Sequence, residues 1–215
     1  MSNCTQVKAS SMTEFFSEHN APDNPYELFR GWFELAKQIR KNEFDYTAMS
    51  LATATPAGKP SVRVVLLKHF DHEGFVFYTN YNSRKGDELH ANPQACLMFY
   101  WPELGKQVRI EGKAAKVAAE ESDQYFASRA KLSQLGAIAS DQSTVIAGRD
   151  VLEKRMQELE QQYQSAHIPR PDHWGGYRVA PGTIEFWQNR DNRLHDRLVY
   201  RRKDNGDWKI ERLAP

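Results

Sequence analysis

Cysteine is scarce in this sequence, with two residues, Cys4 and Cys96, in a chain of 215. One lies in a polar N-terminal stretch and the other lies inside an apolar run. A single disulfide between them is conceivable, but we interpret them as a free pair in a reducing compartment. No His and Cys residues stand at the spacings of a metal site, so no bound metal is expected.

Long apolar runs and an excess of one charge are also missing. Residues 1–20 carry no apolar segment of signal-peptide length, and no stretch is long enough to span a bilayer. We therefore expect a cytoplasmic protein without a membrane partner. The formal net charge is +1, which gives no electrostatic case for nucleic-acid binding. Any anion site must come from local clusters of basic residues.

The pattern of apolar residues predicts one domain over residues 23–215, preceded by a polar and mobile leader over residues 1–22. Asn24, Pro25 and Glu27 are typical of a helix start, and apolar residues recur at helical spacing to about residue 41. Further helices are expected at 83–91, 119–128 and 149–163. Strands are expected at 46–55, 61–69, 75–79, 95–101, 107–117, near 177, and at 184–187, 196–201 and 208–212. This order predicts an α+β, mainly β domain, an antiparallel barrel or sandwich closed by its own C-terminus.

Two basic clusters accompany the predicted strands. Arg63 stands inside the β-branched run 61–68, where its charge can be buried only against an anion or a carboxylate. An edge strand with Arg63 facing solvent is the alternative. Farther along, Tyr78-Thr79 leads into Ser83-Arg84-Lys85 at a predicted helix start, where N–H groups and basic side chains are suited to a phosphate. Many surface turns, however, have the same composition.

Two more clusters lie nearer the C-terminus. If the third helix continues, Tyr125 and Arg129 share a face, and with Ser133 they are suited to a second phosphate; a solvated helix face is the alternative. Arg193, His195 and Arg197 stand at alternate positions and would form a cationic row in an extended chain. Such a row repels itself unless it faces an anion or an electron-rich ring. An exposed strand paired to acidic neighbours is the alternative.

Taken together, these motifs resemble the pyridoxine/pyridoxamine 5′-phosphate oxidases from about residue 25 to the C-terminus. The resemblance is carried by Arg63-Val64-Val65-Leu66-Leu67-Lys68, Tyr78-Thr79, Ser83-Arg84-Lys85, Trp174-Gly175-Gly176, Glu185-Phe186-Trp187-Gln188, Arg193-Leu194-His195-Asp196-Arg197 and the closing residues 208–215. It implies a split β-barrel homodimer with FMN sites shared between the subunits. It also implies hydride transfer from pyridoxamine or pyridoxine 5′-phosphate to FMN, with reoxidation by dioxygen and release of hydrogen peroxide and pyridoxal 5′-phosphate, a step of vitamin B6 biosynthesis and salvage.

The same resemblance assigns roles to individual residues. Arg63, Arg84 and Lys85 would hold the FMN phosphate, and Gln107 and Trp187 would contact the flavin. Arg193 and His195 would close over the substrate ring as the catalytic pair, Arg193 orienting the substrate and stabilising charge and His195 contacting the polar ring substituents. The remaining cofactor residues would be Val64, Val65, Leu66, Leu67, Lys68, Tyr78, Thr79, Gln142, Ser143 and Arg197. The substrate phosphate would be held by Lys68, Tyr125, Arg129 and Ser133.

The N-terminal leader departs from the family pattern. Family members often carry an Arg-x-x-Tyr element there, which folds over the substrate, but Ser11-Met12-Thr13-Glu14-Phe15-Phe16 contains no Arg. We therefore assign no lid residue. Two other functions stay open: a related split-barrel flavoenzyme, such as a flavin reductase, for which a second phosphate site would have no purpose, and a non-catalytic carrier of FMN or pyridoxal phosphate, which would bind the vitamer without making peroxide.

Overall fold

The computed structural model describes residues 16–39 and 45–215, so Cys4 and most of the expected leader lie outside the described residues. No helix in the described part of the chain is long and apolar enough to cross a membrane. In chain order the helices and strands are α1 (Pro25–Lys37), β1 (Ala48–Ala54), β2 (Pro60–Leu66), β3 (His69–Asp71), β4 (Gly74–Asn80), α2 (Arg84–Ala91), β5 (Gln94–Trp101), β6 (Lys106–Lys116), α3 (Ala119–Ser128), α4 (Lys131–Ala139), α5 (Arg149–Gln162), β7 (Trp174–Gln188), β8 (Asp196–Arg202) and β9 (Trp208–Arg212).

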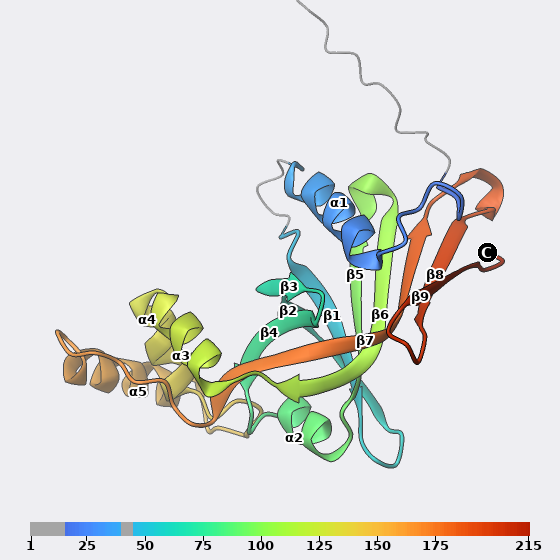
Figure 1. Cartoon of the computed structure of the whole chain (residues 1–215). Helices are drawn as coiled ribbons and strands as arrows, with labels where there is room; N and C mark the ends of the chain where they lie inside the picture. Colours follow the sequence, from blue (N-terminus) through green and yellow to red (C-terminus); the bar gives the residue numbers. More distant parts are fainter. Residues whose placement is uncertain (1–15, 40–44) are drawn as a thin grey trace, which may run out of the picture.

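The strands form one antiparallel sheet, which is curled into a half-barrel (Figure 1). The strand order is β2-β1-β5-β6-β7-β4-β3, and β8 and β9 extend the sheet from β7. β7 is the central strand, because its first part pairs with β4, its second part pairs with β8, and β6 runs along most of it. The sequence predicts two separate strands here, since Pro181-Gly182 interrupts the pattern. The structure joins them into one strand, with a register shift at Gly182 of β7, which has no partner because Pro181 and Thr183 pair with the consecutive residues Gly112 and Glu111 of β6.

Aromatic side chains fill the core between the half-barrel and α1. Phe29 on α1 is fully buried, with its ring centroid 4.9 Å from that of Phe75 and 5.2 Å from that of Phe99. The helix begins as predicted, because the Asn24 side chain accepts a hydrogen bond from the N–H of Tyr26 at 2.9 Å. It ends at Lys37, four residues before the expected end near residue 41.

The described part of the expected leader contacts the domain. Phe16 is buried, and its ring centroid lies 5.3 Å from that of Trp32. Glu18 forms an ion pair of 2.7 Å with Arg212 on β9. Phe16 and Glu18, which belong to the expected leader, therefore pack against the domain.

Helices α3, α4 and α5 form a separate group beside the end of β7 that pairs with β4, away from β8 and β9 (Figure 1). Helix α3 has the predicted bounds, but α4 was not predicted. The helix does not continue to Arg129, the condition under which Tyr125 and Arg129 would share a face, because Arg129 and Ala130 are extended, with ψ of 150° and 142°, before α4 begins. Arg129 therefore lies in the link between two helices and shares no helical face with Tyr125.

The expected extended row of Arg193, His195 and Arg197 is also wrong. Residues 191–193 form a tight turn, in which Asn192 and Arg193 have positive φ of 55° and 61°, and β8 begins only at Asp196. An ion pair of 2.6 Å between Arg190 and Asp196 closes this turn. Alternation of side chains applies only to an extended chain, so it does not place Arg193 beside Arg197.

Candidate active site

A cavity of about 700 Å³ is lined by residues from β2, β4, β7 and the helices α2, α3 and α4. Three of its lining residues are basic, namely Lys68, Lys85 and Arg129. None of the described residues that line it is Asp or Glu. Such a concave site with charge of one sign favours an anionic ligand.

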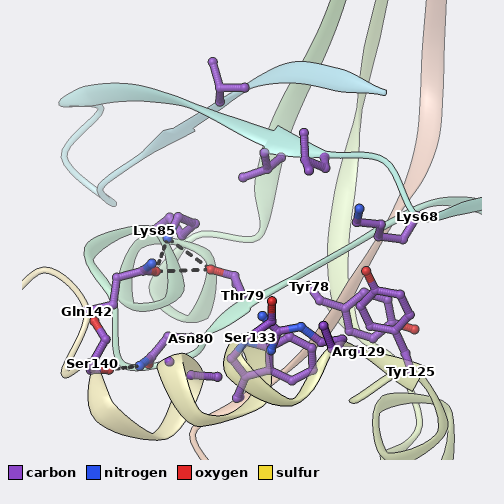
Figure 2. A pocket seen from close by; sticks show the side chains of 17 residues that line it. Lys68, Tyr78, Thr79, Asn80, Lys85, Tyr125, Arg129, Ser133, Ser140 and Gln142 are labelled. Atoms are coloured by element: carbon purple, nitrogen blue, oxygen red, sulfur yellow. Dashed lines mark hydrogen bonds between the residues drawn. The ribbon is translucent and has the colours of Figure 1, made fainter. Parts of the chain in front are cut away.

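Lys85 is the best-defined cation of this cavity and is buried in the first turn of α2. Its Nζ donates hydrogen bonds to Thr79 Oγ1 at 3.0 Å, Ser83 Oγ at 3.0 Å and Gln142 Oε1 at 2.7 Å, as Figure 2 shows for Thr79 and Gln142. All three acceptors are uncharged. Burial, together with the charge of Arg63, lowers the pKa of Lys85 to about 8.

Ser83 occupies the N-cap position of α2, at the predicted helix start, but its hydroxyl does not cap the helix. It donates instead to the carbonyl of Asn80 at 2.7 Å and accepts from Lys85. The first N–H groups of α2 therefore have no side-chain acceptor from the N-cap residue. A helix start of this kind, next to a buried ammonium group, is suited to a phosphate.

A second polar group lies in another part of the cavity and contains Lys68, Tyr125, Arg129 and Ser133 (Figure 2). The Arg129 guanidinium lies 4.6 Å from the ring centroid of Trp174, and burial lowers its pKa. Its Nη1 is buried and makes no hydrogen bond within the described residues. A buried donor without an acceptor is costly, and an anion in the cavity would satisfy it.

Arg63 does not line the cavity and instead meets a carboxylate. Its Nη1 donates to the carbonyl of Leu51 at 3.0 Å and to Thr53 Oγ1 at 2.6 Å. Its Nη2 contacts Ser61 Oγ and lies 3.4 Å from Glu88 Oε2. Arg84, which shares that carboxylate, donates from Nε to Glu88 Oε1 at 2.9 Å.

Gln107, Trp187 and Arg197 form a group away from the cavity. They lie directly opposite one another on the adjacent strands β6, β7 and β8. The ring of His195 lies 4.6 Å from that of Trp187, and Arg197 pairs with Glu185 at 2.8 Å. Arg193 is exposed in the turn before β8. We call these five residues, Gln107, Trp187, Arg193, His195 and Arg197, the strand-end group.

The structure brings most of the predicted site residues to one of two places, but Arg63 and Arg84, which pair with Glu88, lie in neither. The cavity is lined by Val64, Val65, Leu66, Lys68, Tyr78, Thr79, Lys85, Tyr125, Arg129, Ser133 and Gln142. Leu67 belongs instead to the hydrophobic core, and Ser143 is exposed outside the cavity lining, with a φ of 76°. Trp174, at the start of β7, lines the cavity, whereas Trp187 lies thirteen residues farther along the same strand, roughly 40 Å at the usual rise of an extended chain.

The face of the sheet between these two places carries exposed apolar side chains. Val62 and Val64 on β2 are 68% and 66% exposed, and Tyr100 on β5 is 53% exposed. Tyr100 lies opposite Gln107, which lies opposite Trp187, so this apolar face is continuous with the strand-end group. An exposed apolar face of this kind is typical of a protein–protein contact.

Two residues of the site region received no role from the sequence. Trp174 was part of a recognised motif, and the structure stacks it against Arg129 in the cavity. Glu88 stands four residues after Arg84, a helical spacing that predicts this ion pair. Its contact with Arg63 on another strand depends on tertiary structure and has no local sequence pattern.

Comparison with known proteins identifies the family. Residues 35–163 match the family model described as pyridoxamine 5′-phosphate oxidase, and residues 174–215 match that of the pyridoxine 5′-phosphate oxidase C-terminal dimerisation region. The chain belongs to the pyridoxamine 5′-phosphate oxidase family. This confirms the resemblance seen in the sequence motifs.

Relatives within the pyridoxamine 5′-phosphate oxidase family cover nearly the whole chain. A protein of Nostoc punctiforme named pyridoxine/pyridoxamine 5′-phosphate oxidase is 57% identical over 204 residues, which are 94% of each chain. A protein of the same name from Rubrobacter xylanophilus is 54% identical over 93% of this chain and 90% of its own.

Two solved structures are similar in fold. PhzG from Burkholderia lata, in complex with tetrahydrophenazine-1-carboxylic acid, has a TM-score of 0.87 at 35% identity and covers 96% of this chain and 100% of its own. A pyridoxamine 5′-phosphate oxidase-related, FMN-binding protein from Nostoc punctiforme has a TM-score of 0.69 at 17% identity, covering 87% of this chain and 97% of its own. The half-barrel sheet and these likenesses confirm the expected split β-barrel.

Proposed function

We propose that this chain is an FMN-dependent oxidase that converts pyridoxamine 5′-phosphate and pyridoxine 5′-phosphate to pyridoxal 5′-phosphate. The observation that carries this proposal is a cavity with two separate cationic groups and no acidic residue among its described lining residues. One phosphate belongs to FMN and the other to the substrate. The relatives named pyridoxine/pyridoxamine 5′-phosphate oxidase, at 54–57% identity, support this choice of substrate.

The residues around Lys85 fit the phosphate of FMN. The buried ammonium group is surrounded by neutral acceptors, and its lowered pKa reflects a charge without a counter-ion, which a phosphate would supply. Arg84, with its Nη atoms unpaired within the described residues, and the start of α2 lie beside it. When bound there, FMN supplies a hydride acceptor that dioxygen can reoxidise with formation of hydrogen peroxide.

The residues around Arg129 fit the phosphate of the substrate. Arg129 offers the unpaired Nη1, Lys68 adds a second positive charge, and the Tyr125 and Ser133 hydroxyls are additional donors. Tyr125 is fixed by the ring of Tyr78, 3.9 Å away between centroids. These groups would bind and orient a phosphorylated vitamer, so that the carbon to be oxidised takes one position in the site.

The strand-end group would reach the cavity of a second copy of the chain. Residues 174–215, which match the dimerisation region, include Trp187, Arg193, His195 and Arg197. A homodimer that buries the exposed apolar face beside Val62, Val64 and Tyr100 would join one copy's cavity to the other copy's strand-end group. In such a site Gln107 and Trp187 would contact the flavin, and Arg193 and His195 would cover the substrate ring.

The likeness to PhzG supports a second candidate, a split-barrel flavoenzyme with a different substrate. The ligand in that structure is a carboxylic acid, tetrahydrophenazine-1-carboxylic acid. A carboxylate would also be attracted to Arg129 and Lys68. The higher identity of the relatives named pyridoxine/pyridoxamine 5′-phosphate oxidase favours the phosphate, and an activity assay separates the two candidates.

An anaerobic titration tests the proposal. Pyridoxamine 5′-phosphate is added to the FMN-loaded protein while the visible flavin absorption is followed, and air is then admitted. We expect bleaching, followed by recovery of the absorption with formation of pyridoxal 5′-phosphate and peroxide. Pyridoxamine without the phosphate serves as the control and should bleach only at much higher concentration. A protein that binds FMN but never bleaches with either pyridoxamine or pyridoxine 5′-phosphate would overturn the activity and favour a carrier or another flavoenzyme.

A further inference from the structure

Glu88 is a buried carboxylate among the basic residues next to the cavity. It is 5% exposed on α2, and its Oε1 accepts from Arg84 Nε at 2.9 Å. Its Oε2 contacts Thr53 Oγ1, accepts from Ser61 Oγ at 2.5 Å and lies 3.4 Å from Arg63 Nη2. Burial raises the pKa of Glu88, but the hydrogen bonds from Ser61, Thr53 and Arg84 outweigh this effect and bring it to about 2. The carboxylate is therefore ionised at every pH at which the enzyme would work.

The contacts of Glu88 leave part of Arg84 free. Glu88 takes the Nε of Arg84, while the Nη1 and Nη2 atoms of Arg84 make no hydrogen bond to the described residues. Arg63, by contrast, has all four Nη hydrogens directed at oxygen atoms of Leu51, Thr53, Ser61 and Glu88. Neither Glu88 nor Arg84 lines the cavity: Arg84 is exposed beside Lys85 at the start of α2, and the Glu88 carboxylate does not occupy the place of a ligand.

We propose that Glu88 is a positioning residue of the FMN phosphate site, which fixes Arg84 through Nε and leaves both Nη groups to the phosphate. This inference rests on the proposed binding of FMN at Lys85. Two Nη donors held in a fixed plane suit the paired oxygens of a phosphate better than a freely rotating guanidinium group, because less side-chain entropy is lost on binding.

The charge of Glu88 also suits this role. Arg63, Arg84 and Lys85 are three cations that repel one another, and Glu88 reduces their net charge to +2. A phosphate monoester carries about −1.5 to −2 at neutral pH, which nearly balances that charge. Glu88 thereby holds the arginines together while enough positive charge remains for the ligand.

Competition is the alternative to positioning, and it predicts the opposite result. If Glu88 mainly competed with the phosphate for the arginines, its removal would strengthen FMN binding. If Glu88 positions Arg84, its removal weakens the binding of FMN and leaves the binding of riboflavin unchanged, since riboflavin lacks the phosphate. The ratio of the two affinities therefore separates positioning from a general loss of structure.

The test compares the full-length Glu88→Gln variant with the wild type by quenching of flavin fluorescence. We expect the Kd for FMN to rise about 10- to 100-fold, the range for loss of a charge-assisted hydrogen bond, while the Kd for riboflavin stays within about twofold. Asp87→Asn is the matched control, because Asp87 is exposed in the same helical turn and pairs with neither arginine within the described residues. It should leave both constants unchanged.

Several outcomes would overturn the proposal. They are an equal loss of FMN and riboflavin affinity, tighter FMN binding, or an unchanged Kd for FMN. If Glu88→Gln does not fold, Glu88→Asp serves instead, because it retains the negative charge but moves the carboxylate back by one methylene. This variant should lower the affinity for FMN and leave the affinity for riboflavin unchanged. An affinity for FMN equal to that of the wild type would contradict the positioning role. A wild-type protein that binds FMN no better than riboflavin would overturn the FMN site as well. One that prefers FMN but makes no pyridoxal 5′-phosphate would overturn only the proposed activity.

Discussion

Lys85 gives the proposed FMN site a pH dependence. Its pKa is about 8, below the usual value for lysine, because burial and Arg63 disfavour the charged form. A bound phosphate favours the charged form and raises this pKa, so binding takes up a proton above pH 8. We therefore expect the Kd for FMN to be nearly constant from about pH 6.5 to 7.5 and to rise above pH 8, approaching about tenfold per pH unit.

The measurement is a series of FMN and riboflavin titrations between pH 6.5 and 9.5. The Kd for riboflavin should change little, since it has no phosphate to interact with Lys85. Lys85→Met should bind FMN about 10- to 100-fold more weakly, with the rise above pH 8 removed. A rise that persists in Lys85→Met would assign the titration to another group.

Arg129 is expected to act on the substrate and not on FMN. Without its guanidinium group the substrate phosphate loses a charge-assisted hydrogen bond, so Arg129→Met should raise the KM for pyridoxamine 5′-phosphate about 10- to 100-fold. FMN affinity should stay unchanged, because Lys85 lies in a separate part of the cavity. Steady-state peroxide production and flavin titration measure the two effects.

Lys131→Met is the control for Arg129→Met. Lys131 begins α4, donates to the carbonyl of Gln164 and does not line the cavity. Its substitution should leave both KM and FMN affinity unchanged. If Arg129→Met lost FMN and kept a normal KM, the assignment of the two phosphates to the two groups would be reversed.

At the scale of elements, the position of α2 depends on Gly86. A Cβ at this position would lie 1.9 Å from the carbonyl oxygen of Tyr81, a backbone atom that cannot turn away. Gly86→Ala should therefore push α2 and Lys85 away from β4. We expect a loss of about 1–3 kcal/mol in the free energy of unfolding, measured by denaturant titration, together with weaker FMN binding.

Gly31→Ala is the matched control on α1. A Cβ there has no neighbour within 4 Å, so alanine should stabilise the helix by about 0.5–1 kcal/mol without changing FMN affinity. If Gly86→Ala bound FMN as tightly as the wild type, the position of α2 would tolerate the added methyl group, and the close contact would not control the site.

Elements with strong local patterns were predictable, and those set by tertiary contacts were not. The cap at Asn24 and the bounds of α3 follow from local sequence. The continuity of β7 through Pro181 depends on pairing with its neighbours, and Pro181 alone favours a break. The left-handed backbone of Arg193 is closed by the pair of Arg190 and Asp196, so alternation along the sequence gave the wrong side-chain directions there.

At the scale of the whole molecule, the sequence motifs named most of the polar residues that line the cavity but did not give their arrangement. Lys68, Lys85 and Arg129 are distant in sequence, and only the fold brings them to one cavity. The family resemblance implied a site shared between subunits, so the strand-end group need not come from the same chain as the cavity. In a single chain Trp187 lies near the far end of β7 from Trp174, which lines the cavity, and the shared dimer site is a testable proposal.

A complementation experiment tests whether two chains share one site. Arg129→Met removes a residue of the cavity, and Arg193→Leu removes a residue of the strand-end group. The two variants are coexpressed with different affinity tags, and dimers carrying both tags are isolated. If the site is shared, each such dimer has one site with Arg129 and Arg193 both intact and one site with neither, so about half of the wild-type activity per dimer should return.

The assay uses a pyridoxamine 5′-phosphate concentration far below the KM of Arg129→Met, so that each variant alone is nearly inactive. Each variant purified by the same two-tag procedure is the control. If Arg129 and Arg193 of the same chain formed a site, both sites of the mixed dimer would be defective and no activity would return. Normal kinetics of Arg193→Leu alone, with both substrates, would instead remove Arg193 from the catalytic pair. The activity of the mixed dimer therefore decides between a site within one chain and a site between two, which sequence motifs alone cannot distinguish.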